Sequence, residues 1–393
     1  MSIALYQGNH PKDLHNTGHA GLFFQKFFDG FNRQFSDFED KDHAKRDFLE
    51  KFAGHQGNET ALNQACLRQI ELVEKLGGQW FVVSTTEASA FVTGLGNLHP
   101  VENGFLWHHT LGTPYMQGSA IKGILRSWLE IHLGYGAPDS GDAQQDLVDL
   151  QRYFGSDHKD PKQQKLDQQA GKLVFFDAIP IDRPRLKTEV MTPHMGNYYA
   201  QGAKNPGQAD TIPADWHSPT PIPFLVVDKA SFLISFAPRM TLPAQDKQNI
   251  SEELSDLATA LKNALAQMGA GAKTATGFGR LCENEKATKD LYGDWQTQKN
   301  LQARGTMSAE LIIIQDALEV ITNSSSQTLM PGQANYIKFV DLVKKTETWS
   351  IEHRTELMEK VISKWLEKTF SDKKKQKENK KKFVEKHPWL KFD

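Results

Sequence analysis

The chain has 393 residues, of which 39% are hydrophobic and 24% charged, and its formal net charge is −2. This composition is ordinary for a globular protein and excludes collagen-like repeats and wholesale disorder. No run approaches the roughly 20 apolar residues that a spanning helix needs, so we expect no membrane partner. The two cysteines, Cys66 and Cys282, give neither a disulfide framework nor a thiolate zinc site, which favours a reducing cytoplasm.

The charges are unevenly distributed along the chain. Residues 364–393 carry 11 Lys against 5 acidic groups, whereas residues 1–363 carry 43 acidic against 35 basic groups. An acidic body argues against a protein that coats nucleic acid over its whole surface, but it permits a narrow basic groove. The lysine-rich tail is typical of a solvated helix face or a loose end, with nucleic-acid contact as the less frequent alternative.

Residues 1–78 are expected to form a helical segment that packs on the core. Aromatic residues recur at three- and four-residue steps between Phe23 and Phe38 and predict a helix over 20–52. A second apolar stripe predicts a helix over 60–76, which ends at Gly77-Gly78.

Residues 79–290 are expected to form the main domain. In chain order the predicted elements are a strand over 80–85, a long loop over 94–118, a helix from Ser119, a polar surface insertion over 136–170, a strand over 173–176, two apolar runs at 224–227 and 231–236 that form a hairpin or one bent strand, a helix over 247–268 and a strand over 278–282. Residues 182–221 hold six prolines without a sustained period, a length of connection that suggests a function.

The order strand, helix, strand, strand, helix, strand is that of the ferredoxin-like βαββαβ unit, which is also the scaffold of the RNA-recognition module. We therefore expect an α+β fold with four antiparallel strands backed by two helices. Residues 291–393 show helical periodicity and are expected to form a helical C-terminal extension that ends in the lysine-rich tail. The fold alone does not decide the function.

The glycine-rich segment 269–279 follows a predicted helix and precedes a strand. It is not a Walker A loop, because Ala272 stands where a glycine must precede the lysine, and it also lacks the dinucleotide fingerprint. Its backbone N–H groups, Lys273 and the hydroxyls of Thr274 and Thr276 suit an RNA phosphate or sugar. A helix cap followed by a tight turn explains the segment equally well.

No catalytic or metal constellation is apparent. No pair of histidines has the HExxH spacing, and no nucleophile elbow is present, so we expect neither a metal nor a cofactor. Lys122 and Arg126 are four residues apart and share a helix face distinct from the apolar stripe.

Four stretches carry a family resemblance. They are GLGNLHPVENGFLWHHTLGTPYMQGSAIKGILRSWLE (94–130), FFDAIP (175–180), EVMTPHMGNYY (189–199) and GAGAKTATGFGRL (269–281). In combination they resemble the RAMP superfamily of CRISPR proteins, and within it a subunit of the Cmr complex, the type III-B RNA-guided effector. The resemblance covers roughly residues 12–285 and leaves the C-terminal extension without a family account.

The resemblance implies a ferredoxin-like RAMP domain with a long β-hairpin thumb, for which residues 182–221 are the best candidate. It implies that the glycine-rich loop and the first-helix region contact the guide RNA backbone. The residues that correspond here are Ser119, Lys122, Arg126, Gly271, Lys273, Thr274, Thr276 and Gly277. The implied partners are crRNA, target RNA, the backbone RAMP proteins and the small subunit of the complex.

Three functional hypotheses remain open at this point. The leading one is a non-catalytic guide-RNA-binding subunit that caps the backbone stack at the 3′ end of the crRNA, in antiviral defence. The rival is a metal-independent endoribonuclease that processes precursor guide RNA, with His99, His108 or His194 as the acid or base. The third is a scaffold whose loops hold protein neighbours.

Overall fold

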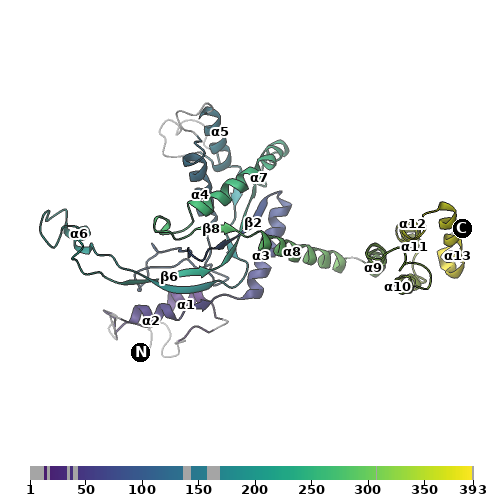
Figure 1. Cartoon of the computed structure of the whole chain (residues 1–393), viewed down its shortest axis with the longest axis horizontal. Helices are drawn as coiled ribbons and strands as arrows, with labels where there is room; N and C mark the ends of the chain where they lie inside the picture. The colour runs from purple at the N-terminus through teal and green to yellow at the C-terminus, as the bar shows by residue number, and fades with distance from the viewer. Residues whose placement is uncertain are drawn as a thin grey trace. The chain divides into compact units, whose positions relative to one another are not determined.

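The structure is a computed structural model that describes residues 13–15, 18–32, 36–38, 43–135, 143–156, 169–306 and 308–391. The chain divides into two compact units, Met1–Trp295 and Gln296–Asp393, and each has a hydrophobic core of its own (Figure 1). Within the described residues, no helix is long and apolar enough to cross a membrane.

The first unit is built on an antiparallel sheet with the strand order β3-β7-β2-β8, beside which β4 also pairs with β7. Its strands are β2 (Gln79–Thr85), β3 (Leu173–Phe175), β4 (Ile179–Pro180), β7 (Ser231–Pro238) and β8 (Leu281–Glu283). Phe81 lies opposite Ile234, and Thr85 lies opposite Leu281. The apolar run of β7 is buried from Phe232 onward, as expected of a central strand that is covered on both faces.

Helices cover the two faces of this sheet. α4 (Gly118–Ile131) packs on α7 (Ala244–Gln267), which in turn packs on β2 and β8, while α3 (Glu59–Lys75) packs on β2, β4 and β7 (Figure 1). All three helices were predicted from their apolar periodicity. The structure confirms a mixed fold of helices and antiparallel sheets. The last strand, predicted over 278–282, is shorter and begins only at Leu281.

The predicted helix over 20–52 is wrong. Two short helices occur instead, α1 (Ala20–Lys26) and α2 (Ala44–Glu50), and residues 27–30 between them are not helical. The aromatic spacing has a different cause: rings from both helices meet in one cluster, in which Phe24 and Phe48 have their centroids 5.9 Å apart. Part of the predicted span, 33–35 and 39–42, lies outside the described residues.

A second, smaller sheet has the strand order β1-β5-β6, with β1 (Gly54–His55), β5 (Arg185–Met191) and β6 (Ile222–Lys229). β5 and β6 form a hairpin that extends from the body to α6 (Gly196–Gln201) near its far end (Figure 1). β6 pairs with β5 and β7 pairs with β2, so the two apolar runs form one bent strand that passes from sheet to sheet at Ala230, not a hairpin. Residues 182–221, which lack periodicity, nevertheless contain a regular strand.

The polar segment 136–170 is not only a surface insertion. Its described part contains α5 (Ala143–Phe154), in which Tyr153 and Phe154 are buried. Arg152 Nη2 donates to both carboxylate oxygens of Glu253 on α7 at 2.8 Å, and the Tyr153 hydroxyl donates to the same group at 2.7 Å. Residues 136–142 and 157–168 lie outside the described part of the chain.

The second unit is helical. α8 (Glu285–Thr306) runs across the division between the units and is followed by α9 (Ala309–Asn323), α10 (Ala334–Lys344), α11 (Ile351–Glu356), a π-helical stretch Leu357–Ile362, α12 (Ser363–Thr369), α13 (Lys373–Lys386) and a 3₁₀ turn Pro388–Leu390. Phe339, Trp365 and Phe383 form the centre of its core. The lysine-rich tail is therefore a helix with two apolar residues, of which Phe383 is buried and Val384 is half-buried.

Candidate nucleic-acid interface

The glycine-rich loop between α7 and β8 is bound along its length to the segment that follows β2. Ala272 N–H donates to the Val92 carbonyl at 2.8 Å, and Gly279 N–H donates to the Ala90 carbonyl at 2.8 Å. The Ser89 hydroxyl donates to the Gly277 carbonyl at 2.7 Å. The loop is therefore a fixed second layer beside residues 89–92, which is more than a helix cap requires.

The two predicted site glycines of this loop have different surroundings. Gly271 has a φ of +82°, and a Cβ there would lie 2.0 Å from the Val92 carbonyl oxygen. Gly277 has a φ of +96°, but a Cβ there would meet nothing within 4 Å. Of the two predicted site glycines, Gly271 holds the loop in place, and only Gly277 leaves open space for a ligand.

Lys273 is the charged group of the loop. It is a rare non-glycine residue with a left-handed backbone, at a φ of 60°, and its Nζ lies 5.4 Å from the centroid of the Phe224 ring. It forms no ion pair in the part of the chain that the structure describes. The Thr276 hydroxyl donates to the Lys273 carbonyl at 2.9 Å, so its free capacity is that of an acceptor. Thr274 begins the short 3₁₀ turn Thr274–Thr276.

The other predicted residues lie on successive turns at the start of α4. Ser119 is exposed, and Arg126 Nε donates to Glu130 at 2.7 Å. Burial, the charge of Arg126 and the charge of Arg239 together lower the pKa of Lys122. The predicted site residues thus form two groups, one on the loop after α7 and one on α4.

Most of the remaining motif between Gly94 and Gly118 supports the protein's own packing. His99 Nε2 lies 2.8 Å from the Phe24 carbonyl oxygen, and its ring stacks on Phe24 with centroids 4.1 Å apart. A Cβ on Gly104 would lie 2.3 Å from the Asn97 carbonyl oxygen, and one on Gly118 would lie 2.3 Å from that of Phe175. These contacts fix the start of α4, where Ser119 is exposed and Lys122 is half-buried.

The three candidate histidines of an endoribonuclease lie in different settings. His99 is packed among aromatic rings, as above. His108 Nδ1 accepts from the Thr110 and Leu111 N–H groups at 3.3 Å, and burial lowers its pKa although the charge of Asp177 opposes this. His194 lies beyond the end of β5, with Nδ1 3.4 Å from the His217 carbonyl oxygen. No group of three or more His, Cys, Asp or Glu side chains suited to a metal occurs among the described residues.

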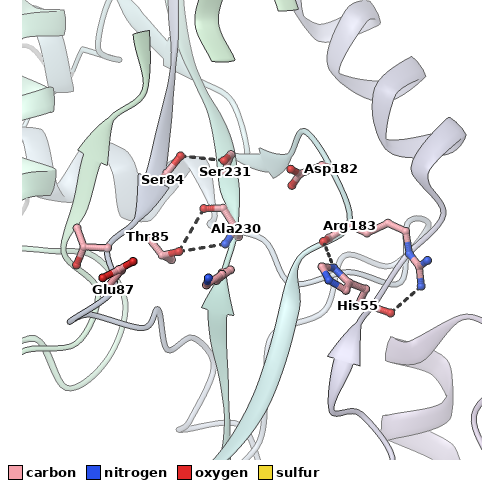
Figure 2. Close-up of a pocket in the computed structure, with 10 residues that line it drawn as sticks. His55, Ser84, Thr85, Glu87, Asp182, Arg183, Ala230 and Ser231 are labelled. Carbon is pink, nitrogen blue, oxygen red and sulfur yellow. Dashed lines mark hydrogen bonds between the residues drawn. The ribbon is translucent and has the colours of Figure 1, made fainter. Parts of the chain in front are cut away.

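A pocket of about 410 Å³ lies where the two sheets meet, at the foot of the β5–β6 hairpin (Figure 2). His55 Nδ1 lies 2.9 Å from the Arg183 carbonyl oxygen, and Arg183 Nη2 donates to the His55 carbonyl at 2.7 Å. Thr85 Oγ1 accepts from the Ala230 N–H at 3.1 Å. Burial raises the pKa of Asp182, although the charge of His55 opposes this. The wall therefore combines two cations, Arg183 and Lys229, and several hydroxyl groups with two carboxylates, Glu87 and Asp182. Its hydroxyls and cations suit sugar and phosphate oxygens, but the carboxylates balance the positive charge.

Sequence reasoning missed this pocket. Its lining comes from four separated stretches, residues 55, 84–87, 182–183 and 229–231, and no motif spacing connects them. The pocket and the glycine-rich loop are neighbours along the chain, because residues 84–87 line the pocket and residues 89–92 hold the loop. Together they form the candidate surface, whose charged groups are the cations Arg183, Lys229 and Lys273 and the carboxylates of Glu87 and Asp182.

The sequence of the first unit matches that of a known class of protein. The profile of the RAMP superfamily matches residues 85–282, which is half of the chain and includes both predicted groups of site residues. The chain belongs to the RAMP superfamily. Within it, the chain is similar to the CRISPR system Cmr subunit Cmr6 of Pyrococcus furiosus, with 32% identity over 242 residues, covering 50% of this chain and 65% of the relative. The chain thus matches slightly less than two thirds of that relative's length.

Two solved structures are also similar. The crystal structure of Cmr6 from Pyrococcus furiosus is 29% identical, and the match covers 53% of this chain and 98% of that one with a TM-score of 0.29. The type III-B Cmr-beta complex bound to cognate target RNA contains a chain that is 18% identical, with 61% and 71% covered and a TM-score of 0.41. Because both TM-scores are below 0.5, the family assignment rests on the sequence and not on these superpositions.

Proposed function

We propose that this chain is the sixth, Cmr6-like subunit of a type III-B CRISPR ribonucleoprotein, and that it binds crRNA without cutting RNA. In this role it caps the stack of backbone RAMP subunits at the 3′ end of the crRNA, contacts the small subunit and the guide–target duplex, and acts in the cytoplasm in antiviral defence. The similarity to Cmr6 and the membership of the RAMP superfamily support this assembly.

The sheet of the first unit supports a ferredoxin-like domain. If β2, β3, β7 and β8 are the four strands of the βαββαβ unit, α4 is its first helix and α7 its second. The spatial order β3-β7-β2-β8 places the first and third of these strands in the centre, and both helices pack together. The β5–β6 hairpin then takes the place of the thumb.

One observation carries the RNA-binding role: Lys273 is held on a rigid loop, in a left-handed conformation, beside an aromatic ring and without an acidic partner. A lysine that serves the stability of the fold has an ion pair or a solvated face and does not need a strained backbone. The geometry instead supports a fixed positive charge for a phosphate, next to the open Gly277.

The absence of catalysis is part of the proposal. His99 Nε2 donates to the Phe24 carbonyl, and its acceptor nitrogen, Nδ1, accepts from the Val101 N–H at 3.2 Å. The acceptor nitrogen of His108 accepts from two backbone N–H groups. A general base must reach the proton of an RNA 2′-hydroxyl, and these contacts withhold the two nitrogens from that task.

The test is guide binding by Lys273→Ala in a complex reconstituted with Cmr partner subunits. The matched control is Lys289→Ala, which removes an exposed lysine of α8. Loss of one phosphate contact on a single strand weakens binding about 4-fold near 0.15 M salt and reduces the slope of log K against log salt by about 0.7. An unchanged slope contradicts the role of Lys273.

Two further outcomes bear on the assembly and on catalysis. A tagged chain that recovers no guide RNA and no Cmr subunit from its native cell would contradict the assembly. Metal-independent cleavage of repeat RNA by the purified chain, removed by His108→Ala, would replace the proposal with the endoribonuclease.

A further inference from the structure

The second unit presents a basic groove outside the matched region of the family. α12 and α13 enclose a space of about 510 Å³, whose lining includes Lys373, Lys374, Lys377 and Lys380 on one side and Leu366 and Glu367 on the other. The four lysines lie at steps of one, three and three residues along α13 and therefore share one helix face.

The lysine face is held in a fixed position by the opposite side of α13. Phe383 is 2% exposed, and its ring centroid lies 5.1 Å from that of Trp365 and 5.8 Å from that of Phe339. The Asp372 side chain accepts from the Lys374 N–H at 2.9 Å and caps the helix, and Gln376 Nε2 donates to the Phe370 carbonyl at 2.6 Å. The lysines are thus displayed by an anchored helix and not by a loose tail.

The charge of this face is not neutralised within the unit. None of the four groove lysines forms an ion pair with a residue that the structure describes, whereas Lys382, outside the groove, pairs with Glu378 at 2.7 Å. Lysines in the first turn face the positive end of the helix, and like charges three and four residues apart repel each other. This arrangement is unfavourable until an anion enters the groove.

We propose that the α12–α13 groove is a second RNA-binding site, which holds the phosphate backbone of a single-stranded RNA without reading its sequence. Lysine is a point charge on a flexible stem, so it contributes affinity and not base recognition. Among the described residues, no aromatic side chain on which a base could stack lines the groove. The preference for RNA among nucleic acids rests on the proposed function, but the contact with phosphate does not.

Other polyanionic partners fit the groove less well. Lysine is depleted in the cores of protein–protein interfaces, and the lining offers one leucine as an apolar anchor. A membrane-surface helix inserts apolar side chains beside its basic face, but Phe383 of α13 is buried in the unit's own core.

The experiment compares two triple variants of the full chain for binding to a fluorescent oligouridylate of about 20 nucleotides over a range of salt. The test variant is Lys374→Gln with Lys377→Gln and Lys380→Gln. The control, Lys338→Gln with Lys345→Gln and Lys386→Gln, removes the same charge from exposed positions of the same unit outside the groove. All six side chains are exposed, so both variants are expected to fold.

The test variant is expected to bind tens of fold more weakly near 0.15 M salt and to lose about 2 from the salt slope, because three phosphate contacts disappear. The control should resemble the parent. Equal behaviour of the two variants would overturn the proposal. So would a groove-dependent binding of phosphatidylserine vesicles with unchanged RNA binding, which would identify a lipid surface as the partner.

Adding Lys273→Ala separates this inference from the proposed function. The two sites are expected to act independently, so their effects on the logarithm of affinity should add. A groove effect without a Lys273 effect contradicts the role of the glycine-rich loop, and the reverse result contradicts the groove.

Discussion

Gly271→Ala is expected to detach the glycine-rich loop from its support. The added Cβ would lie 2.0 Å from the Val92 carbonyl oxygen and 2.8 Å from the Phe91 ring, at a φ of +82°. Val92 is fully buried, so neither it nor the ring has room to withdraw. The loop must therefore move away, and the hydrogen bond of 2.8 Å from the Ala272 N–H to the Val92 carbonyl is lost.

Gly277→Ala is the matched control. It changes the free energy of unfolding through the same backbone effects as Gly271→Ala, but its new Cβ meets no neighbouring atom. A left-handed backbone with a Cβ costs about 1 to 2 kcal/mol at either position. Alanine also reduces the conformational entropy of the unfolded chain, which stabilises the fold by about 0.4 to 1 kcal/mol in both variants. Only Gly271→Ala leaves a buried carbonyl without its donor, which costs about 1 to 3 kcal/mol. The free energy needed to open the loop should therefore be lower in Gly271→Ala than in Gly277→Ala by about 1 to 3 kcal/mol.

Hydrogen exchange followed by mass spectrometry measures this difference within the first unit. Peptides that span 89–95 and 268–281 should exchange roughly 5- to 150-fold faster in Gly271→Ala than in Gly277→Ala, as about 1.4 kcal/mol corresponds to a factor of ten. Peptides from α13 serve as an internal reference. Equal exchange in the two variants would refute the inference that residues 89–92 hold the loop.

Two further predictions follow from burial. Burial, and to a lesser extent the charge of Asp182, raises the pKa of the Cys66 thiol to about 12, so iodoacetamide at about pH 8 should label only the exposed Cys282 in the folded chain. Two adducts without denaturant would contradict this, and Cys282→Ser should give none. Burial also lowers the pKa of His99, although its hydrogen bond to the Phe24 carbonyl opposes this. His99 is therefore neutral in the fold and takes up a proton on unfolding, so the first unit should lose stability as the pH falls below the usual value of 6.5. The urea midpoint should decrease between about pH 7.5 and 5.5, and His99→Gln should flatten the decrease. A midpoint that rises toward acid pH would contradict the assignment.

Sequence periodicity predicted those helices and strands that bury one face and expose the other. α7 is an example, because Ile250, Leu254 and Leu261 recur on its apolar side and are all buried. The same rule failed for residues 20–52, where aromatic rings also recur at helical steps. There the rings of Phe24 on α1 and Phe48 on α2 pack across the two short helices, with centroids 5.9 Å apart. Phe28, between the helices, contacts the rings of Phe31 and Phe38 with centroids 5.1 and 5.7 Å away. A single sequence does not distinguish rings stacked along one helix from rings gathered by tertiary packing.

Long-range pairing accounts for the elements that were missed. β5 has the sequence RLKTEVM, in which Leu186 is the only buried side chain, so its strand character comes from its seven pairs with β6 and not from its own pattern. The candidate surface divides in the same way. Lys273 was proposed from the sequence, as was Lys122 on α4, because both lie in recognisable stretches, whereas Arg183 and Lys229 of the pocket meet only through the fold.

Because one continuous strand passes from β6 into β7, a small change of angle at the base of the β5–β6 hairpin displaces the end of the hairpin. From Arg185 to Met191 the arm is about 20 Å long at the usual rise per residue, so a tilt of about 5° at its foot moves its end by roughly 2 Å. At that foot, Asp228 accepts from Arg185 Nε at 2.8 Å and lies 3.3 Å from Lys187 Nζ. Burial alone would raise the pKa of Asp228, but these two cations hold the pKa below its usual value, so the Asp228 carboxylate stays charged. Arg185, Lys187 and Asp228 therefore connect β5 to β6 at the foot of the hairpin, where the continuous strand enters the central sheet.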